Sequence, residues 1–173
     1  MALFAGVAAT AGFLALAGLR ATEINFEAWS SIPLVYGAIV VSCRLIFARV
    51  PDRLPPLRLG AGSLAACTIG LAVLAVAPSP AGMLAGAAVL GLGIAFLTPA
   101  IFAAIFSIVP AHERGAAAGT ATVFIDLGFG GGPLLLGIIA ADGGIPLAFA
   151  SAAALTAAAI PLLLTSARRQ PVR

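Results

Sequence analysis

The side chains that could do chemistry are few, and two of them carry charge inside apolar stretches. Asp126 stands ten residues into the stretch 116–140, and Arg44 stands five residues before Arg49. If these stretches are helices in a membrane, Asp126 lies ~15 Å deep, where a carboxylate needs a cavity, a partner or another helix. Proton coupling or substrate binding is one interpretation, and a carboxylate bound to backbone or hydroxyl groups at a packed, Gly-rich helix interface is the other.

Arg44 has three interpretations. Its long side chain could extend to the membrane surface from a depth of ~7–8 Å. It could instead face a cavity, or reach toward Asp126 so that both charges are neutralised. Asp126 and Arg44 are therefore the candidates for substrate or ion coupling.

The sequence carries no pattern for enzyme chemistry. It has no phosphate-binding loop, no metal-ligand spacing and no nucleophile–base pair, so we expect no catalytic residue, metal or cofactor. Cys43 and Cys67 fall in apolar stretches and are expected to be buried, without a disulfide. Nine arginines dispersed over 173 residues are too few for a nucleic-acid-binding surface.

The composition predicts an integral membrane protein. Hydrophobic residues make up 62% of the chain and charged residues 9%, with a mean hydropathy of +1.17. A water-soluble surface needs roughly 25–35% charged residues. Because one crossing takes ~20 apolar residues, the length allows about six. We expect an all-α domain over residues 1–165 and a basic cytoplasmic tail at 166–173, with spans at about 1–19, 31–49, 59–77, 81–109, 116–140 and 145–165.

Arginine placement predicts the orientation. Arginines concentrate in cytoplasmic loops. The connections after spans one, three and five hold only Arg20, whereas those after spans two, four and six hold seven arginines: Arg49, Arg53, Arg58, Arg114, Arg168, Arg169 and Arg173. Both termini should therefore be cytoplasmic, with the protein in the plasma membrane. A five-span alternative would place the arginine clusters on opposite sides.

Three stretches resemble the major facilitator superfamily. The connection 48–57 resembles its signature loop Gly-x-x-x-Asp-Arg-x-Gly-Arg-Arg through Asp52-Arg53. Ala48 and Pro55 replace the glycines, and Pro56 and Leu57 replace the paired arginines, which suits the less regular second-half copy of the motif. PAHERGAAAGT (110–120) is similar to the join between the family's tenth and eleventh helices. DLGFGGGPLLLG (126–137) is similar to the Gly-rich centre of the eleventh helix. The order and spacing match the second, C-terminal half of a transporter of this family.

The resemblance implies secondary active transport of a small molecule by alternating access, and drug- or sugar-efflux members look most similar. The family has two six-helix halves, so the expected partners are lipid and a complementary half or a second copy of this chain. The rival interpretation is a membrane protein that binds partners without transporting, or an inactive transporter fragment.

For Asp126, the resemblance favours helix packing and gating over substrate contact. It also implies roles for two further groups of residues. Asp52, Arg53, Glu113 and Arg114 lie in the two charged connections and are the candidate gating residues, of which Glu113 and Arg114 could also stabilise helix ends. The Gly-rich stretch of the fifth span is expected to allow close helix packing or a flexible point. Its residues are Gly128, Gly130, Gly131, Gly132 and Pro133.

Overall fold

The computed structural model describes residues 1–169, apart from the side chains of Asp52, Arg168 and Arg169. This part of the chain is helical and contains no strand. The predicted basic tail, 166–173, lies partly outside the described residues. The helices are α1 (Ala2–Glu23), α2 (Ser31–Ile46), α3 (Val50–Arg53), α4 (Pro56–Val76), α5 (Pro80–Ile108), the 3₁₀ turn η1 (Ala111–Glu113) and α6 (Arg114–Arg169).

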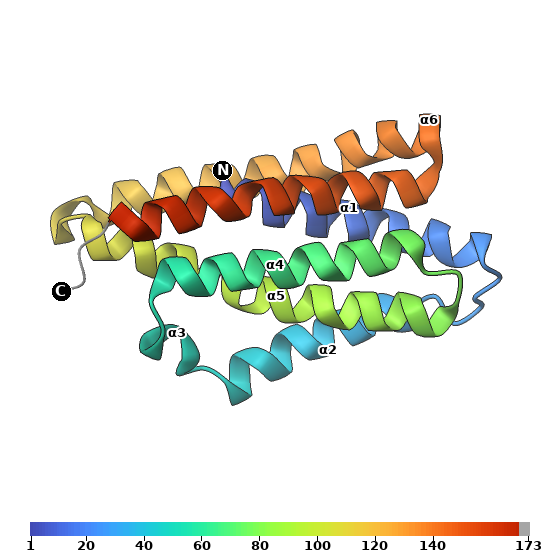
Figure 1. Ribbon diagram of the computed structural model, residues 1–173, viewed down its shortest axis with the longest axis horizontal. Coiled ribbons are helices and arrows are strands. Elements are labelled where there is room, and N and C mark those ends of the chain that lie inside the picture. Colours follow the sequence, from blue (N-terminus) through green and yellow to red (C-terminus); the bar gives the residue numbers. More distant parts are fainter. Residues whose placement is uncertain (170–173) are drawn as a thin grey trace.

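α6 consists of two helical segments that meet at Gly144. This residue has φ 82° and ψ 163°, a conformation that a glycine adopts at little cost because it has no Cβ. Figure 1 shows the segment after Gly144 running back alongside the segment before it. The chain reverses inside the turn predicted at 141–144.

Four helices are long and apolar enough to cross a membrane: α1, α4, α5 and the segment Ala111–Ala167. α2 is apolar too, but it has 16 residues and ends at Ile46 rather than at Arg49 as predicted. After Ile46 the backbone tightens into a turn in which the N–H of Val50 donates to the carbonyl oxygen of Phe47, and Pro51, which has no N–H, lies in the first turn of the next helix. The connection instead forms the short helix α3.

The helices form an elongated bundle in which α5 lies between α4 and α2 (Figure 1). α1 packs mainly on α6, α4 packs on both α5 and α6, and α2 packs mainly on α5. The connections after α2 and α5 lie at one end of the bundle, and the α1–α2 connection, the α4–α5 turn and the reversal of the chain within α6 lie at the other. α2 is therefore an edge helix.

Glycines let the helix backbones approach closely. A Cβ at Gly93 of α5 would lie 2.6 Å from Sγ of Cys67 and 2.7 Å from the carbonyl oxygen of Ser63, both on α4. About one helical turn further along the same contact, a Cβ at Gly70 of α4 would lie 2.6 Å from the backbone nitrogen of Leu90 on α5. Side chains at these positions would force α4 and α5 apart, so the small residues set the distance between the two helices.

Aromatic and hydroxyl contacts join the remaining helices. The buried ring of Phe13 on α1 lies 5.7 Å, between centroids, from Tyr36 on α2 and 6.3 Å from Phe149 on α6. The hydroxyls of Thr68 on α4 and Thr156 on α6 are 2.9 Å apart and share a hydrogen bond. Both cysteines are buried and free, as predicted.

Candidate functional site

Asp126 lies on a narrow stripe of mostly small residues along α6, flanked by the exposed side chains of Val123 and Phe129. Residues three, four and seven positions apart share one side of a helix. The Asp126 face, as we name it, consists of Gly115, Gly119, Thr122, Asp126, Gly130, Pro133 and Gly137. A Cβ at any of its four glycines would meet no atom within 4 Å. The face is therefore uncovered by any described part of this chain.

The other side of the same segment packs tightly on α1. A Cβ at Gly132 would collide with the backbone of Ala8, including its carbonyl oxygen. At Gly128 it would lie 3.0 Å from Cβ of Val7. The predicted Gly-rich stretch thus divides into two sets, with Gly128 and Gly132 against α1 and with Gly130 on the Asp126 face.

The two remaining members of that stretch are Gly131 and Pro133. A Cβ at Gly131 would meet open space, as at Gly130. Pro133 lies inside α6, whose only non-helical residue is Gly144. The backbone therefore stays helical through Pro133, and any flexibility there remains a prediction.

Arg44 and Asp126 do not meet. Arg44 is exposed near the C-terminal end of α2, and α2 and α6 lie on opposite flanks of the bundle (Figure 1). Among the described residues Arg20 and Glu23 form an ion pair, and Nε2 of the exposed His112 lies 3.4 Å from Oε1 of Glu113. Arg44 instead lines a cavity of about 410 Å³ between α2 and α5, together with aromatic residues such as Phe102.

The two charged connections hold the candidate gating residues at one end of the bundle. Arg53 is exposed and ends α3, while the side chain of Asp52 lies outside the described residues. Oε1 of Glu113 lies 3.4 Å from Nε2 of His112. Nη2 of Arg114 donates a hydrogen bond of 3.2 Å to the carbonyl oxygen of Phe106 on α5. In this chain Arg114 therefore stabilises the α5–α6 connection.

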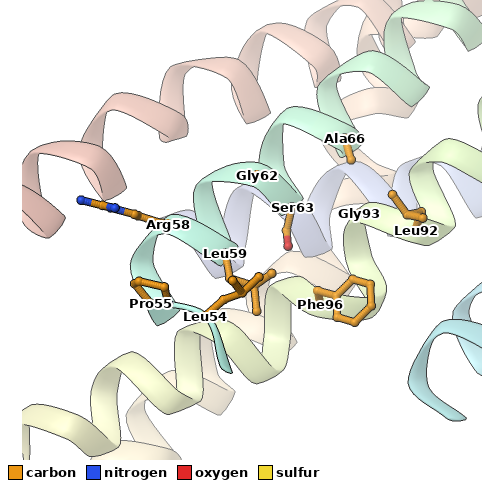
Figure 2. A pocket seen from close by; sticks show the side chains of 10 residues that line it. All are labelled: Leu54, Pro55, Arg58, Leu59, Gly62, Ser63, Ala66, Leu92, Gly93 and Phe96. Atoms are coloured by element: carbon orange, nitrogen blue, oxygen red, sulfur yellow. The ribbon is translucent and has the colours of Figure 1, made fainter. Parts of the chain in front are cut away.

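A groove opens between α4 and α5 next to the first of these connections (Figure 2). Its volume is about 450 Å³, and most of its lining is apolar. Arg58, in the first turn of α4, extends outward at its rim. The sequence predicted the basic connection but gave no sign of the groove, because the groove depends on how α4 and α5 pack.

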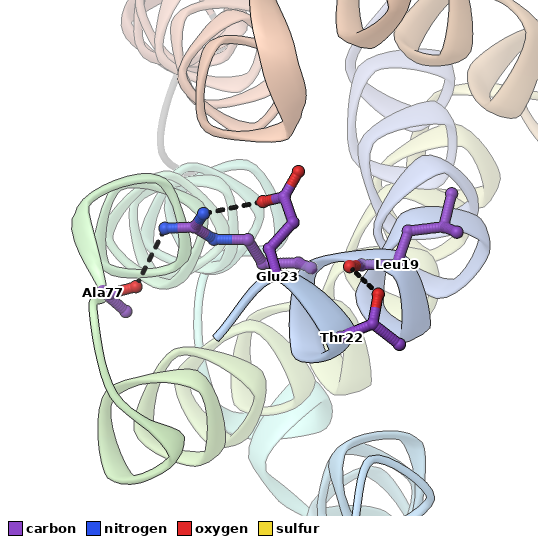
Figure 3. Close-up of polar contacts among 5 residues, drawn as sticks. Leu19, Thr22, Glu23 and Ala77 are labelled. Atoms are coloured by element: carbon purple, nitrogen blue, oxygen red, sulfur yellow. Dashed lines mark hydrogen bonds and ion pairs between the residues drawn. The ribbon is translucent and has the colours of Figure 1, made fainter. Parts of the chain in front are cut away.

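Arg20 has a role that the sequence did not indicate. Its Nη1 lies 2.8 Å from Oε2 of Glu23, and its Nη2 donates a hydrogen bond of 3.1 Å to the carbonyl oxygen of Ala77 (Figure 3). Ala77 follows α4, so this side chain, only 14% exposed, ties the end of α1 to the end of α4. The only sign of this role in the sequence was that Arg20 is the single arginine in the connections after spans one, three and five.

Long apolar helices in one bundle, with arginines gathered at one end, define a polytopic membrane protein. A family model described as Major Facilitator Superfamily matches residues 1–173. The chain belongs to the Major Facilitator Superfamily, which confirms the family predicted from the three motifs.

Relatives in this family carry transporter names. The chain is 33% identical over 164 residues to an uncharacterized MFS-type transporter of Burkholderia mallei (strain SAVP1), and the match covers 93% of the chain and 40% of the relative. It is 32% identical over 165 residues to one of Pseudomonas aeruginosa (strain UCBPP-PA14), covering 92% of the chain and 41% of the relative. The chain therefore spans about two fifths of the length of these relatives.

Proposed function

We propose that this chain forms one six-helix half of a secondary active transporter that moves a small molecule across the plasma membrane. Family membership and the transporter names of the relatives support transport. The chain's share of the relatives' length, about two fifths, supports its being one half. Drug or sugar efflux, which the motifs resemble, stays a prediction.

The proposed topology has six crossings with both termini in the cytoplasm. The crossings are α1, α2, α4, α5 and the two segments of α6 on either side of Gly144. Figure 1 supports this order, because the connections after α2 and α5 lie at one end of the bundle, and Arg49, Arg53, Arg58 and Arg114 lie in or directly beside them. The other end holds Arg20, which is engaged by Glu23 and Ala77.

The observation that carries the proposal is the uncovered Asp126 face. A carboxylate in a membrane span is costly when it faces lipid, so it normally faces a protein partner or an aqueous cavity. Gly-rich helix faces allow another helix to approach closely. We propose that a complementary half, or a second copy, meets the Asp126 face, and that the two bodies move against each other during transport.

Transport should require both halves. We would join this chain to the part of the Pseudomonas aeruginosa relative that the match leaves uncovered, and reconstitute the chain and the joined protein in vesicles. The compounds tested are those that the intact relative accumulates under an imposed proton gradient, chosen from labelled sugars and cationic drugs. The joined protein should accumulate the same compounds, and the chain alone should accumulate none.

Two outcomes would contradict this proposal. One is accumulation by the chain alone when cross-linking shows it to be monomeric. The other is a folded joined protein that accumulates nothing the intact relative does, which would favour the interpretation as a non-transporting membrane protein.

A further inference from the structure

The α4–α5 groove combines an apolar wall with a basic rim. Its wall includes Leu59 and Gly62 on α4 and Leu92 and Phe96 on α5. Its floor is closed, because α4 and α5 touch at Gly93. The groove is thus a depression in the outer surface of the bundle and does not pass between the helices.

One arginine borders the groove, and further arginines border the two other cavities at this end of the bundle. Arg58 borders the groove itself, and Arg53, five residues earlier, borders a neighbouring cavity of about 490 Å³ together with Arg49. Arg44 lines the third cavity at this end, which shares Phe96 with the α4–α5 groove. Between residues 44 and 58 the sequence has four arginines and a single acid.

The two ends of the groove would contact different parts of a bilayer. Leu54 and Leu92 are 47% and 46% exposed, so apolar surface is open to the surroundings here. Arg58 stands at the cytoplasmic end under the proposed topology, at the level of the lipid headgroups. An apolar channel beneath a cluster of arginines is complementary to a molecule with an anionic head and a hydrocarbon tail.

We propose that the α4–α5 groove binds an anionic phospholipid, with its phosphate on Arg58 and Arg53 and one acyl chain along Leu59, Gly62 and Phe96. The guanidinium groups form charge-assisted hydrogen bonds to phosphate. The apolar wall gains the burial of acyl methylene groups. This proposal rests on the membrane placement given above and not on transport, so a chain that fails to transport would still bind the lipid.

The test measures lipid bound to the purified chain in detergent by native mass spectrometry. Phosphatidylglycerol is the anionic probe and phosphatidylcholine with the same acyl chains is the neutral one. The chain should bind phosphatidylglycerol more tightly. Arg58→Gln should weaken phosphatidylglycerol binding about fivefold, the effect of one arginine at an anionic surface, and leave phosphatidylcholine nearly unchanged.

A second variant tests the acyl-chain part of the site. A Cβ at Gly62 would have no atom within 4 Å, so Gly62→Leu should place its side chain in the groove and still fold. It should weaken binding of both lipids. Gly37→Leu, at another open glycine on α2, and Arg114→Gln are the matched controls. Arg114 is exposed and lies outside the groove, where its substitution removes only the hydrogen bond to the carbonyl of Phe106, so both variants should bind lipid as the unchanged chain does.

Several results would overturn the proposal. Equal binding of the two lipids would show that the arginines do not recognise an anionic headgroup. An Arg114→Gln effect as large as that of Arg58→Gln would show diffuse surface charge rather than a site. Undiminished phosphatidylglycerol binding by a folded Gly62→Leu protein would show that the lipid does not lie in the groove.

Discussion

Replacing Gly132 by leucine should leave no folded protein, whereas the same change at Gly130 should be tolerated. A side chain at position 132 would collide with the backbone of Ala8 on α1, and backbone cannot rotate aside as a side chain can. Ordinary overpacking costs about 1–3 kcal/mol, and a backbone collision should exceed that range. At Gly130 the leucine would extend into open space on the Asp126 face.

The measurement is gel filtration and thermal unfolding of the two variants in the same detergent. Gly130→Leu serves as the control for changed hydrophobicity within the same helix. A Gly132→Leu protein that elutes and unfolds like the unchanged chain would show that α1 and α6 do not pack as described. Once joined to the complementary part, Gly130→Leu should also impair transport, because its side chain would block the Asp126 face.

The second large effect concerns Asp126. In the joined protein, Asp126→Asn should nearly abolish proton-driven accumulation while leaving the stability of this chain unchanged. The physical reason is that the carboxylate is exposed and has no hydrogen-bond or ion-pair partner among the described residues, so this half loses no contact. An amide cannot take up or release a proton, and it cannot form the ion pair that gating would need.

Asp142→Asn is the matched control, since Asp142 is an exposed acid close to the turn at Gly144. Accumulation and thermal unfolding would be measured for both variants. Full accumulation by Asp126→Asn would exclude coupling or gating by this acid. A lowered unfolding temperature of the chain alone would instead indicate that Asp126 packs against a neighbour within this half.

The family and the apolar stretches could be predicted from the sequence because they depend on local composition. Long apolar runs need no tertiary information to be recognised, and Asp52-Arg53 is a contiguous motif. The turn at 141–144 was predictable for the same reason, since two glycines follow Asp142 there. The early end of α2 was missed because the apolar pattern continues to Arg49 although the helix does not.

Helix rotation and partners distant in sequence could not be predicted. The stretch 128–132 has four glycines, but only the packing of α6 on α1 determines that Gly128 and Gly132 make the contact. Arg20 reaches a backbone carbonyl 57 residues away, and any residue at position 77 would supply that carbonyl. Arg44 and Asp126 do not form the pair considered from the sequence, because their helices lie on opposite flanks of the bundle.

The central claim is a six-crossing half whose arginine-rich connections are cytoplasmic, and cysteine labelling in intact cells tests it most directly. Single cysteines would replace exposed residues in a chain whose Cys43 and Cys67 are alanine. A membrane-impermeant maleimide should label positions 30, 78 and 142 from outside, and should label positions 48 and 112 only after the cells are opened. Labelling of position 48 or 112 from outside, or protection of position 142, would contradict the account.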